Sequence, residues 1–213
     1  MIQVIGAGLA GCEAAWQIAQ AGERVVLREM KPQRFSPAHK SPLFAELVCS
    51  NSLKARRLDS AAGLLKEEMR RMGSLLVACA EQCAVPAGGA LAVDRDLFAA
   101  AVTEKIRSHA NIEVVDGEVT ELPAEGPAVI ATGPLTSETL AEKISALCGG
   151  SLSFFDAAAP IVTADSLNRE KIFAASRYGR EEAGAEGAYL NCPMNKAEYE
   201  TFYQALIEAE PAP

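Results

Sequence analysis

The fold of this chain is decided by its first 29 residues, which read MIQVIGAGLAGCEAAWQIAQAGERVVLRE. The apolar run Ile2–Ile5 predicts a strand, and the glycine-rich turn Gly6–Gly11 follows it directly. Residues 12–20 have the apolar spacing of a helix, and the run 25–29 predicts a second strand. Strand, glycine turn, helix and strand together form the first half of a Rossmann-like, doubly wound α/β fold.

Each glycine of the turn has a physical task in such a fold. Gly6 allows the tight turn, Gly8 lets the backbone approach a pyrophosphate, and Gly11 allows the helix to pack closely on the strand. The helix N-terminus offers free N–H groups and partial positive charge to the phosphates. Glu29 ends the second strand, where a carboxylate accepts hydrogen bonds from ribose hydroxyls and repels the extra phosphate of NADP. The predicted cofactor-binding residues of this stretch are Gly6, Ala7, Gly8, Leu9, Ala10, Gly11 and Glu29.

The motif by itself leaves the cofactor open between FAD and NAD, and glycine-rich turns also occur in βαβ units that bind nothing. Here the strand, the helix and Glu29 are all in place, which favours a dinucleotide. The position at the start of the chain, together with a glutamate at the strand end, favours FAD.

Composition limits the other possibilities. The 213 residues are enough for one large domain, or for one domain and part of another, and the 49% of hydrophobic residues can form a sizeable core. The net charge of −8 argues against a polyanion-binding surface over the whole chain but leaves room for a local basic patch. No apolar run of membrane-spanning length and no secretory signal occur, so we expect no membrane association.

The cysteines indicate a reducing compartment. None of the six forms a C-x-x-C pair, so we expect no zinc site and no other metal site. Scattered cysteines without a secretory signal are typical of reduced thiols in a cytoplasm. They are Cys12, Cys49, Cys79, Cys83, Cys148 and Cys192.

Two further stretches carry candidate functional residues. Residues 30–42 contain three prolines, which exclude regular structure and predict a long connection able to lie over a cofactor. Within it, His39 is interpreted as a solvated loop histidine. Cys49 lies in the apolar-to-polar junction 44–53, where a buried inert thiol is favoured over a reactive thiol at a helix start. The basic residues that follow, Lys54, Arg56 and Arg57, are either a solvated charge run or a phosphate contact.

The rest of the chain alternates between helical and extended patterns. Val119 is placed where a dinucleotide fold passes an adenine, and Thr132 and Gly133 end a strand whose small residues allow a ligand to approach. Beyond residue 151 the character of the sequence changes. Helices are predicted over 61–83, 97–109, 137–147 and 196–208, strands over 112–115, 118–122, 128–134 (buried), 153–156 and 159–162, a short strand within 85–95, and a loop over 177–187.

With these residues laid out, the chain resembles the N-terminal part of the TrmFO family, the folate- and FAD-dependent tRNA (uracil-5-)-methyltransferases related to the GidA flavoproteins. The similarity runs in family order over nearly the whole chain. The matching stretches are residues 6–16 (GAGLAGCEAAW), 44–53 (FAELVCSNSL), 63–71 (GLLKEEMRR), 85–95 (VPAGGALAVDR), 130–135 (IATGPL), 156–162 (DAAAPIV) and 189–194 (YLNCPM).

The resemblance implies an activity. Reduced FAD and 5,10-methylenetetrahydrofolate supply a one-carbon unit to C5 of the T-loop uracil in tRNA, and NAD(P)H reduces the flavin. Cys49 matches a cysteine to which the family assigns a catalytic role, which reverses the interpretation of Cys49 as inert. The thiol acts either as a base or as a nucleophile.

The resemblance also implies an organisation. Residues 1–150 correspond to the first segment of a GidA-type FAD-binding domain, and residues 151–213 to the incomplete start of an inserted α+β domain. Family members carry a second catalytic cysteine in an F-E-G-C context that is absent here, and Cys192 does not match it. We therefore expect a truncated or split member, with its C-terminal half possible as a separate chain. The alternatives are an FAD-binding module without turnover and a different FAD or NAD(P)H oxidoreductase.

Overall fold

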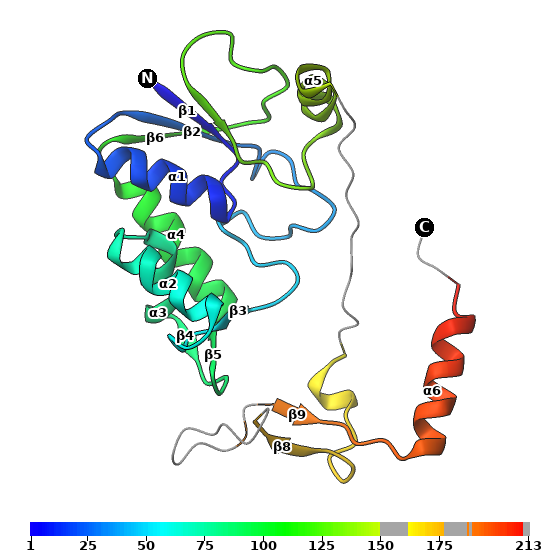
Figure 1. Ribbon diagram of the computed structural model, residues 1–213. Helices are drawn as coiled ribbons and strands as arrows, with labels where there is room; N and C mark the ends of the chain where they lie inside the picture. Colours follow the sequence, from blue (N-terminus) through cyan, green and yellow to red (C-terminus); the bar gives the residue numbers. More distant parts are fainter. Residues whose placement is uncertain (150–161, 177–186, 188, 211–213) are drawn as a thin grey trace. The chain divides into compact units, whose positions relative to one another are not determined.

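The computed structural model describes residues 1–149, 162–176, 187 and 189–210 (Figure 1). The chain divides into two compact units. The described residues of the first unit are 1–85 and 89–149, and those of the second are 86–88, 162–176, 187 and 189–210.

A parallel four-stranded sheet forms the centre of the first unit. Its strand order is β6-β2-β1-β7, so the strand that begins the chain lies inside the sheet. Val4 pairs with Leu27, and Leu27 pairs with Val114, which places three apolar side chains in one row across the sheet. The strands are β1 (Ile2–Ile5), β2 (Val25–Glu29), β6 (Ile112–Asp116) and β7 (Ala128–Ile130).

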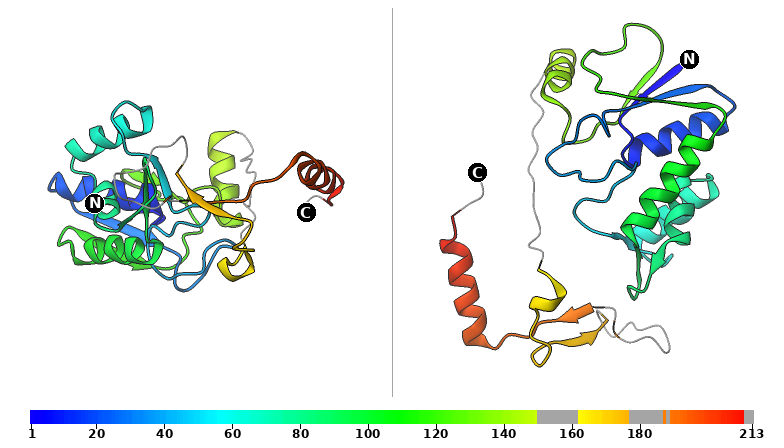
Figure 2. Two further views of the ribbon diagram at one scale, coloured as in Figure 1. Left: turned by 90° about the horizontal axis from the view of Figure 1, so that it is seen from below. Right: turned by 180° about the vertical axis from the view of Figure 1, so that it is seen from behind.

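Helices α1 (Leu9–Gln20) and α4 (Arg95–Ser108) lie side by side against this sheet, as the views in Figures 1 and 2 agree. The helix predicted over 97–109 is confirmed as α4, whose Phe98, Val102 and Ile106 are fully buried. Burying each such side chain contributes about 1.5–3 kcal/mol. Asp94 caps α4, because its carboxylate accepts hydrogen bonds from the N–H groups of the first helical turn.

The continuous helix predicted over residues 61–83 is two helices, α2 (Ala61–Arg71) and α3 (Leu75–Gln82). The chain breaks at Gly73, whose φ of +74° is a left-handed conformation that ends a helix. Ser74 then caps α3 by accepting a hydrogen bond from the Val77 N–H. The helical spacing is confirmed, but Leu64 and Leu65 of α2 remain 50% and 55% exposed, so their periodicity does not mark a core face.

A small antiparallel sheet follows the irregular connection. Its order is β3-β5-β4, with β5 at the centre. The stretch 30–51 between β2 and β3 contains no helix or strand, which confirms the prediction made from the prolines for residues 30–42. The strands are β3 (Ser52–Ala55), β4 (Ala84–Val85) and β5 (Ala90–Val93).

Of the strands predicted after β6, one is absent and one is shorter and more exposed than predicted. Residues 118–122 form no strand: Gly117, with a φ of +143°, turns the chain out of the sheet, and Glu118 and Val119 line a pocket. Strand β7 covers only residues 128–130 of the predicted 128–134, and it is not buried because it lies at the edge of the sheet and, among the described strands, pairs with β1 alone. Val129 and Ile130 accordingly stay 37% and 38% exposed.

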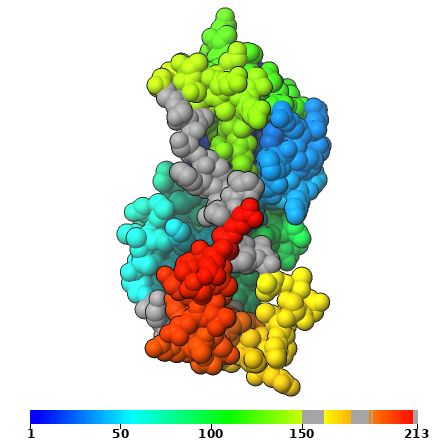
Figure 3. All heavy atoms as spheres, turned by 90° about the vertical axis from the view of Figure 1, so that its right-hand side faces the viewer, coloured from blue at the N-terminus to red at the C-terminus, as the bar shows by residue number. Residues whose placement is uncertain are grey.

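Helix α5 (Glu138–Cys148) ends the described part of the first unit and agrees with the predicted helix at 137–147. Gly149 ends it with a φ of +71°. Its Leu140 is buried at 2% exposure, whereas Leu147 is 72% exposed. Figure 3 shows α5 in yellow-green at the surface of the first unit.

The second unit contains a β-hairpin and a helix. Strands β8 (Phe173–Ala175) and β9 (Tyr189–Asn191) pair antiparallel. A 3-10 turn, Ala164–Ser166, precedes them, and α6 (Lys196–Glu208) follows with a capping box between Asn195 and Glu198. The helix confirms the prediction for 196–208, and none of its residues is buried; its red and orange surface is visible in Figure 3.

The strands predicted at 153–156 and 159–162, the loop predicted at 177–187 and the domain boundary predicted at 150/151 lie wholly or mainly outside the described residues, so these expectations stay predictions. Among the described residues, no helix has both the length and the apolar character needed to cross a membrane.

Candidate functional site

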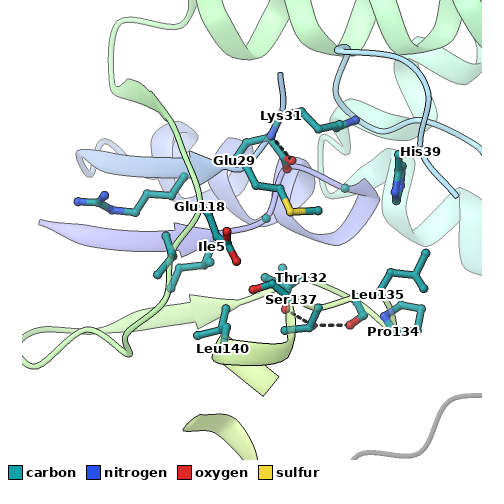
Figure 4. A pocket seen from close by; sticks show the side chains of 18 of the residues that line it. Ile5, Glu29, Lys31, His39, Glu118, Thr132, Pro134, Leu135, Ser137 and Leu140 are labelled. Carbon is teal, nitrogen blue, oxygen red and sulfur yellow. Dashed lines mark hydrogen bonds between the residues drawn. The ribbon is translucent and has the colours of Figure 1, made fainter. Parts of the chain in front are cut away.

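A pocket of about 310 Å³ opens at the carboxyl edge of the four-stranded sheet (Figure 4). Residues at or just after the end of each of its four strands line this pocket. Doubly wound sheets bind their ligands at this edge, and the volume is at the lower end of the range for ligand cavities, about 300–1,000 Å³. Eight of the ten predicted cofactor-binding residues line it: Gly6, Gly8, Leu9, Ala10, Glu29, Val119, Thr132 and Gly133.

The glycine turn shapes one wall of the pocket. Gly6 has a φ of +97°, and a Cβ there would lie 2.7 Å from the Ala131 carbonyl oxygen, so both conformation and space require glycine. A Cβ on Gly8 would meet no atom within 4 Å. The backbone at Gly8 is therefore bare toward the pocket, which is the cradle that a pyrophosphate needs. Gly11 does not line the pocket, and a Cβ there would lie 1.7 Å from the Gly6 carbonyl oxygen.

Ala7 and Glu29 join the glycine turn to the end of β2. The Ala7 N–H donates to Glu29 Oε2 at 2.6 Å, and the Lys31 N–H donates to Glu29 Oε1 at 3.0 Å. Ala7 is buried outside the pocket, so its contribution is this hydrogen bond. Each carboxylate oxygen of Glu29 has a second lone pair, which leaves acceptors for ribose hydroxyls.

Lys31 is a buried cation beside Glu29, with 4% of its side chain exposed. Its ammonium donates to the Leu43 carbonyl and lies 3.7 Å from Glu46 Oε2. Glu46 in turn accepts from the N–H groups of Lys40 and Ser41. This set of bonds ties the irregular connection to the end of β2, so the connection is held in place next to the pocket.

His39 lies in this connection and lines the pocket (Figure 4). Its Nδ1 is 2.6 Å from Ser36 Oγ, and burial, followed by the charge of Lys31, lowers the pKa of His39. The prediction of a solvated loop histidine is confirmed for the loop but not for full solvation, because His39 is only partly exposed. Nothing in the local sequence distinguishes a solvated histidine from this one, since its surroundings come from Lys31 and Glu46.

The opposite wall is formed by the segments that follow β6 and β7. Arg34 donates two hydrogen bonds to the Glu118 carboxylate, at 2.6 and 2.5 Å, and this contact lowers the pKa of Glu118. It fixes the segment that carries Val119. After β7, the Thr132 and Thr136 hydroxyls are 2.6 Å apart, and the Thr136 hydroxyl donates to the Gly133 carbonyl at 2.7 Å, closing this turn.

Cys49 is exposed and lies in an irregular segment three residues before β3. Both sequence interpretations of its surroundings are wrong: the thiol is not buried, and no helix begins there, since α2 starts only at Ala61. Cys49 does not line the pocket, but its neighbour Val48 does. Because consecutive Cα atoms are about 3.8 Å apart, Cys49 lies at the margin of the predicted cofactor site.

These residues fit a dinucleotide such as FAD. The bare backbone at Gly8, the N-terminus of α1 and the buried Glu29 provide acceptor and donor groups for phosphates and a ribose at one edge. No His, Cys, Asp or Glu cluster able to hold a metal ion occurs among the described residues.

Comparison with known proteins identifies the family. The profile of the family described as "Glucose inhibited division protein A" matches residues 1–213. The chain belongs to this family. The family assignment confirms the resemblance read from the motifs and the predicted GidA-type α/β fold.

The curated relatives of this family member carry a more specific name. A protein of Geobacter sulfurreducens named "Methylenetetrahydrofolate--tRNA-(uracil-5-)-methyltransferase TrmFO" is 61% identical over 212 residues, covering 100% of this chain and 48% of the relative. A Shouchella clausii protein of the same name is 58% identical over 213 residues, again 100% of this chain and 48% of the relative. The chain spans about half the length of the curated relatives it matches. The structure of Aquifex aeolicus GidA is similar to 59% of this chain, covering 21% of that chain, with 15% identity and a TM-score of 0.47.

Proposed function

We propose that this chain is part of an enzyme that methylates C5 of the T-loop uracil in tRNA, taking the one-carbon unit from 5,10-methylenetetrahydrofolate and using FAD. The observation that carries the proposal is the 61% identity, over the whole chain, to a relative with that printed name. The pocket supports it, because a dinucleotide cofactor is required and the geometry at the carboxyl edge fits one.

Bound FAD would supply the redox chemistry by which the transferred carbon becomes a methyl group, with NAD(P)H as the source of electrons. The residues of this chain hold and orient that cofactor. Gly8 and the N-terminus of α1 take the pyrophosphate, and Glu29 takes the ribose. Val119, Thr132 and Gly133 form the facing wall.

Cys49 is the residue to which we assign the chemistry on uracil. Uracil C5 is a weak nucleophile until a group adds at C6 or a proton is removed, and a thiolate can do either. The position of Cys49 at the pocket margin supports the assignment, since a substrate base must lie near the cofactor but outside its cradle.

The rest of the proposal concerns the remaining part of the enzyme and its location in the cell. We infer that residues beyond the half matched here are needed for turnover, because the relatives are about twice as long. The missing half is either joined to this chain or supplied as a separate chain. The cytoplasm is the proposed location, supported by six thiols that are all unpaired.

The test is methyl transfer to a tRNA transcript lacking ribothymidine, with FAD, NAD(P)H and methylenetetrahydrofolate. The 213-residue chain is assayed alone and mixed with the segment of the Geobacter sulfurreducens relative that it does not match. We expect turnover in the mixture, lost in Cys49→Ala and kept in Cys148→Ala, a matched control at another exposed thiol. Turnover that survives Cys49→Ala would show that the catalytic assignment is wrong.

A further inference from the structure

A cluster of four cations follows Cys49 on the surface of the first unit. It consists of Lys54 in β3, Arg56 and Arg57 in the turn after it, and Lys66 in α2, which packs against β3 (Figure 1). We call these four residues the basic cluster. They are outside the lining of the cofactor pocket, so the proposed flavin chemistry leaves them without a role.

The charges of the basic cluster are only partly neutralised. Arg57 donates to Asp59 at 2.9 and 2.6 Å and forms the only ion pair of the cluster within the described part of the chain. Lys66 donates instead to the carbonyls of Ala55 and Ala62, at 2.9 and 3.0 Å. Within this described region, Lys54, Arg56 and Lys66 therefore concentrate three uncompensated positive charges in a chain whose net charge is −8.

Two of these cations lie close enough to repel each other. Burial lowers the pKa of Lys66, and the positive charge of Lys54 lowers it further. Placing like charges together costs free energy unless an anion compensates them. The N-terminus of α2, capped by Ser60, adds partial positive charge beside Arg57, whose carbonyl accepts from the Ser60 hydroxyl at 2.7 Å.

The backbone at Lys54 is a second, independent observation. Lys54 has a φ of +67°, and the pairing of β3 with β5 shifts register between Ser52 and Ala55. A register shift of this kind re-aims a side chain, and a left-handed conformation is unfavourable for a residue with a Cβ. Glycine would adopt this backbone without strain. The position nevertheless holds a long, exposed cation, and strained residues of this kind cluster at binding sites.

We propose that the basic cluster binds the phosphate backbone of the RNA whose base is presented to Cys49; this inference rests on the proposed function. Cys49 and Lys54 are five residues apart, so their Cα atoms are at most about 18 Å apart. Phosphate contacts at that distance set the register of an RNA without reading its sequence. The chain as a whole has a net charge of −8, so a local cluster of cations favours the approach of RNA at this area over the acidic parts of the surface.

The test measures binding of a fluorescently labelled tRNA transcript to the 213-residue chain over a series of salt concentrations. The variant Lys54→Ala/Arg56→Ala should bind about tenfold more weakly or worse at low salt, and the slope of log K against log salt should fall by about 2, one for each lost phosphate contact. The matched control Arg24→Ala/Lys143→Ala removes the same charge elsewhere and should change neither quantity. Lys54→Arg/Arg56→Lys keeps both charges and should retain the slope.

Three results would overturn the inference: no RNA binding by the unmodified chain at low salt, an equal loss in the control variant, or binding of a polyglutamate peptide with no binding of RNA. Circular dichroism of each variant checks that its fold is kept. The proposed function fails separately. Loss of methyl transfer under all conditions, with RNA binding that still depends on the basic cluster, leaves this inference intact.

Discussion

Replacing Gly11 by alanine should destabilise the first unit, whereas the same change at Gly8, three residues earlier, should not. A Cβ added at Gly11 would lie 1.7 Å from the Gly6 carbonyl oxygen and 2.9 Å from its carbon, so α1 must retreat by roughly 1.5 Å to restore a normal contact. Gly6 cannot move away, because it already packs closely against Ala131.

Two opposing effects set the change in the free energy of unfolding that Gly11→Ala causes. Overpacking costs about 3 kcal/mol at the upper end of its usual range, and exchanging a helical glycine for alanine returns about 1 kcal/mol. We therefore expect Gly11→Ala to lower the free energy of unfolding by about 2 kcal/mol or more. At Gly8 a Cβ meets nothing within 4 Å and φ is −72°. Losing glycine at the N-cap there is offset by the lower entropy of the unfolded chain, so the net change stays within about 1 kcal/mol.

The assay is urea unfolding followed by the fluorescence of Trp16, which is the single tryptophan and lies in α1 of the first unit. With a slope of about 2 kcal/mol per molar urea, the Gly11→Ala midpoint should fall by about 1 M. Gly8→Ala should keep its midpoint and lose affinity for FAD, because its methyl group occupies the pyrophosphate cradle. The reasoning is refuted if Gly11→Ala unfolds at the wild-type midpoint, or if Gly8→Ala is destabilised as much.

Three further outcomes are expected. Burial raises the pKa of the Cys12 thiol from 9.0 to about 12, so the neutral thiol stabilises the fold fully below pH 9 and progressively less above it. The free energy of unfolding measured with urea should therefore fall by about 2 kcal/mol between about pH 9 and 10.5, and Cys12→Ala should lack this fall. The pKa of His39 is lowered, so its stabilisation is present above pH 6.5 and is lost as the pH falls. His39→Gln should flatten the acid side of the stability profile, and an unchanged profile would contradict the half-buried position of His39. Lys54→Gly should raise the free energy of unfolding by about 0.5–1 kcal/mol because it relieves a φ of +67°, and thermal unfolding that shows a decrease would argue against strain there.

The sequence by itself determined the parts of this protein that depend on neighbouring residues. Strand β1, helix α1 and strand β2 were predictable because apolar periodicity and the glycine turn act over short distances. The same holds for the Asp94 cap of α4 and for α6. The pocket at the carboxyl edge could be expected for the same reason, since parallel strands bring their ends together.

Only the tertiary structure decided what depends on contacts between distant segments. His39 was interpreted as solvated because no local signal reports the buried Lys31 and the partly buried Glu46 that hold its loop. Residues 118–122 have strand-like composition, but Gly117 turns the chain so that Glu118 and Val119 line the pocket, where Arg34 holds Glu118. The exposure of Cys49 and of β7 likewise depends on which other segments of the chain pack against them. Apolar periodicity does not report which segments those are.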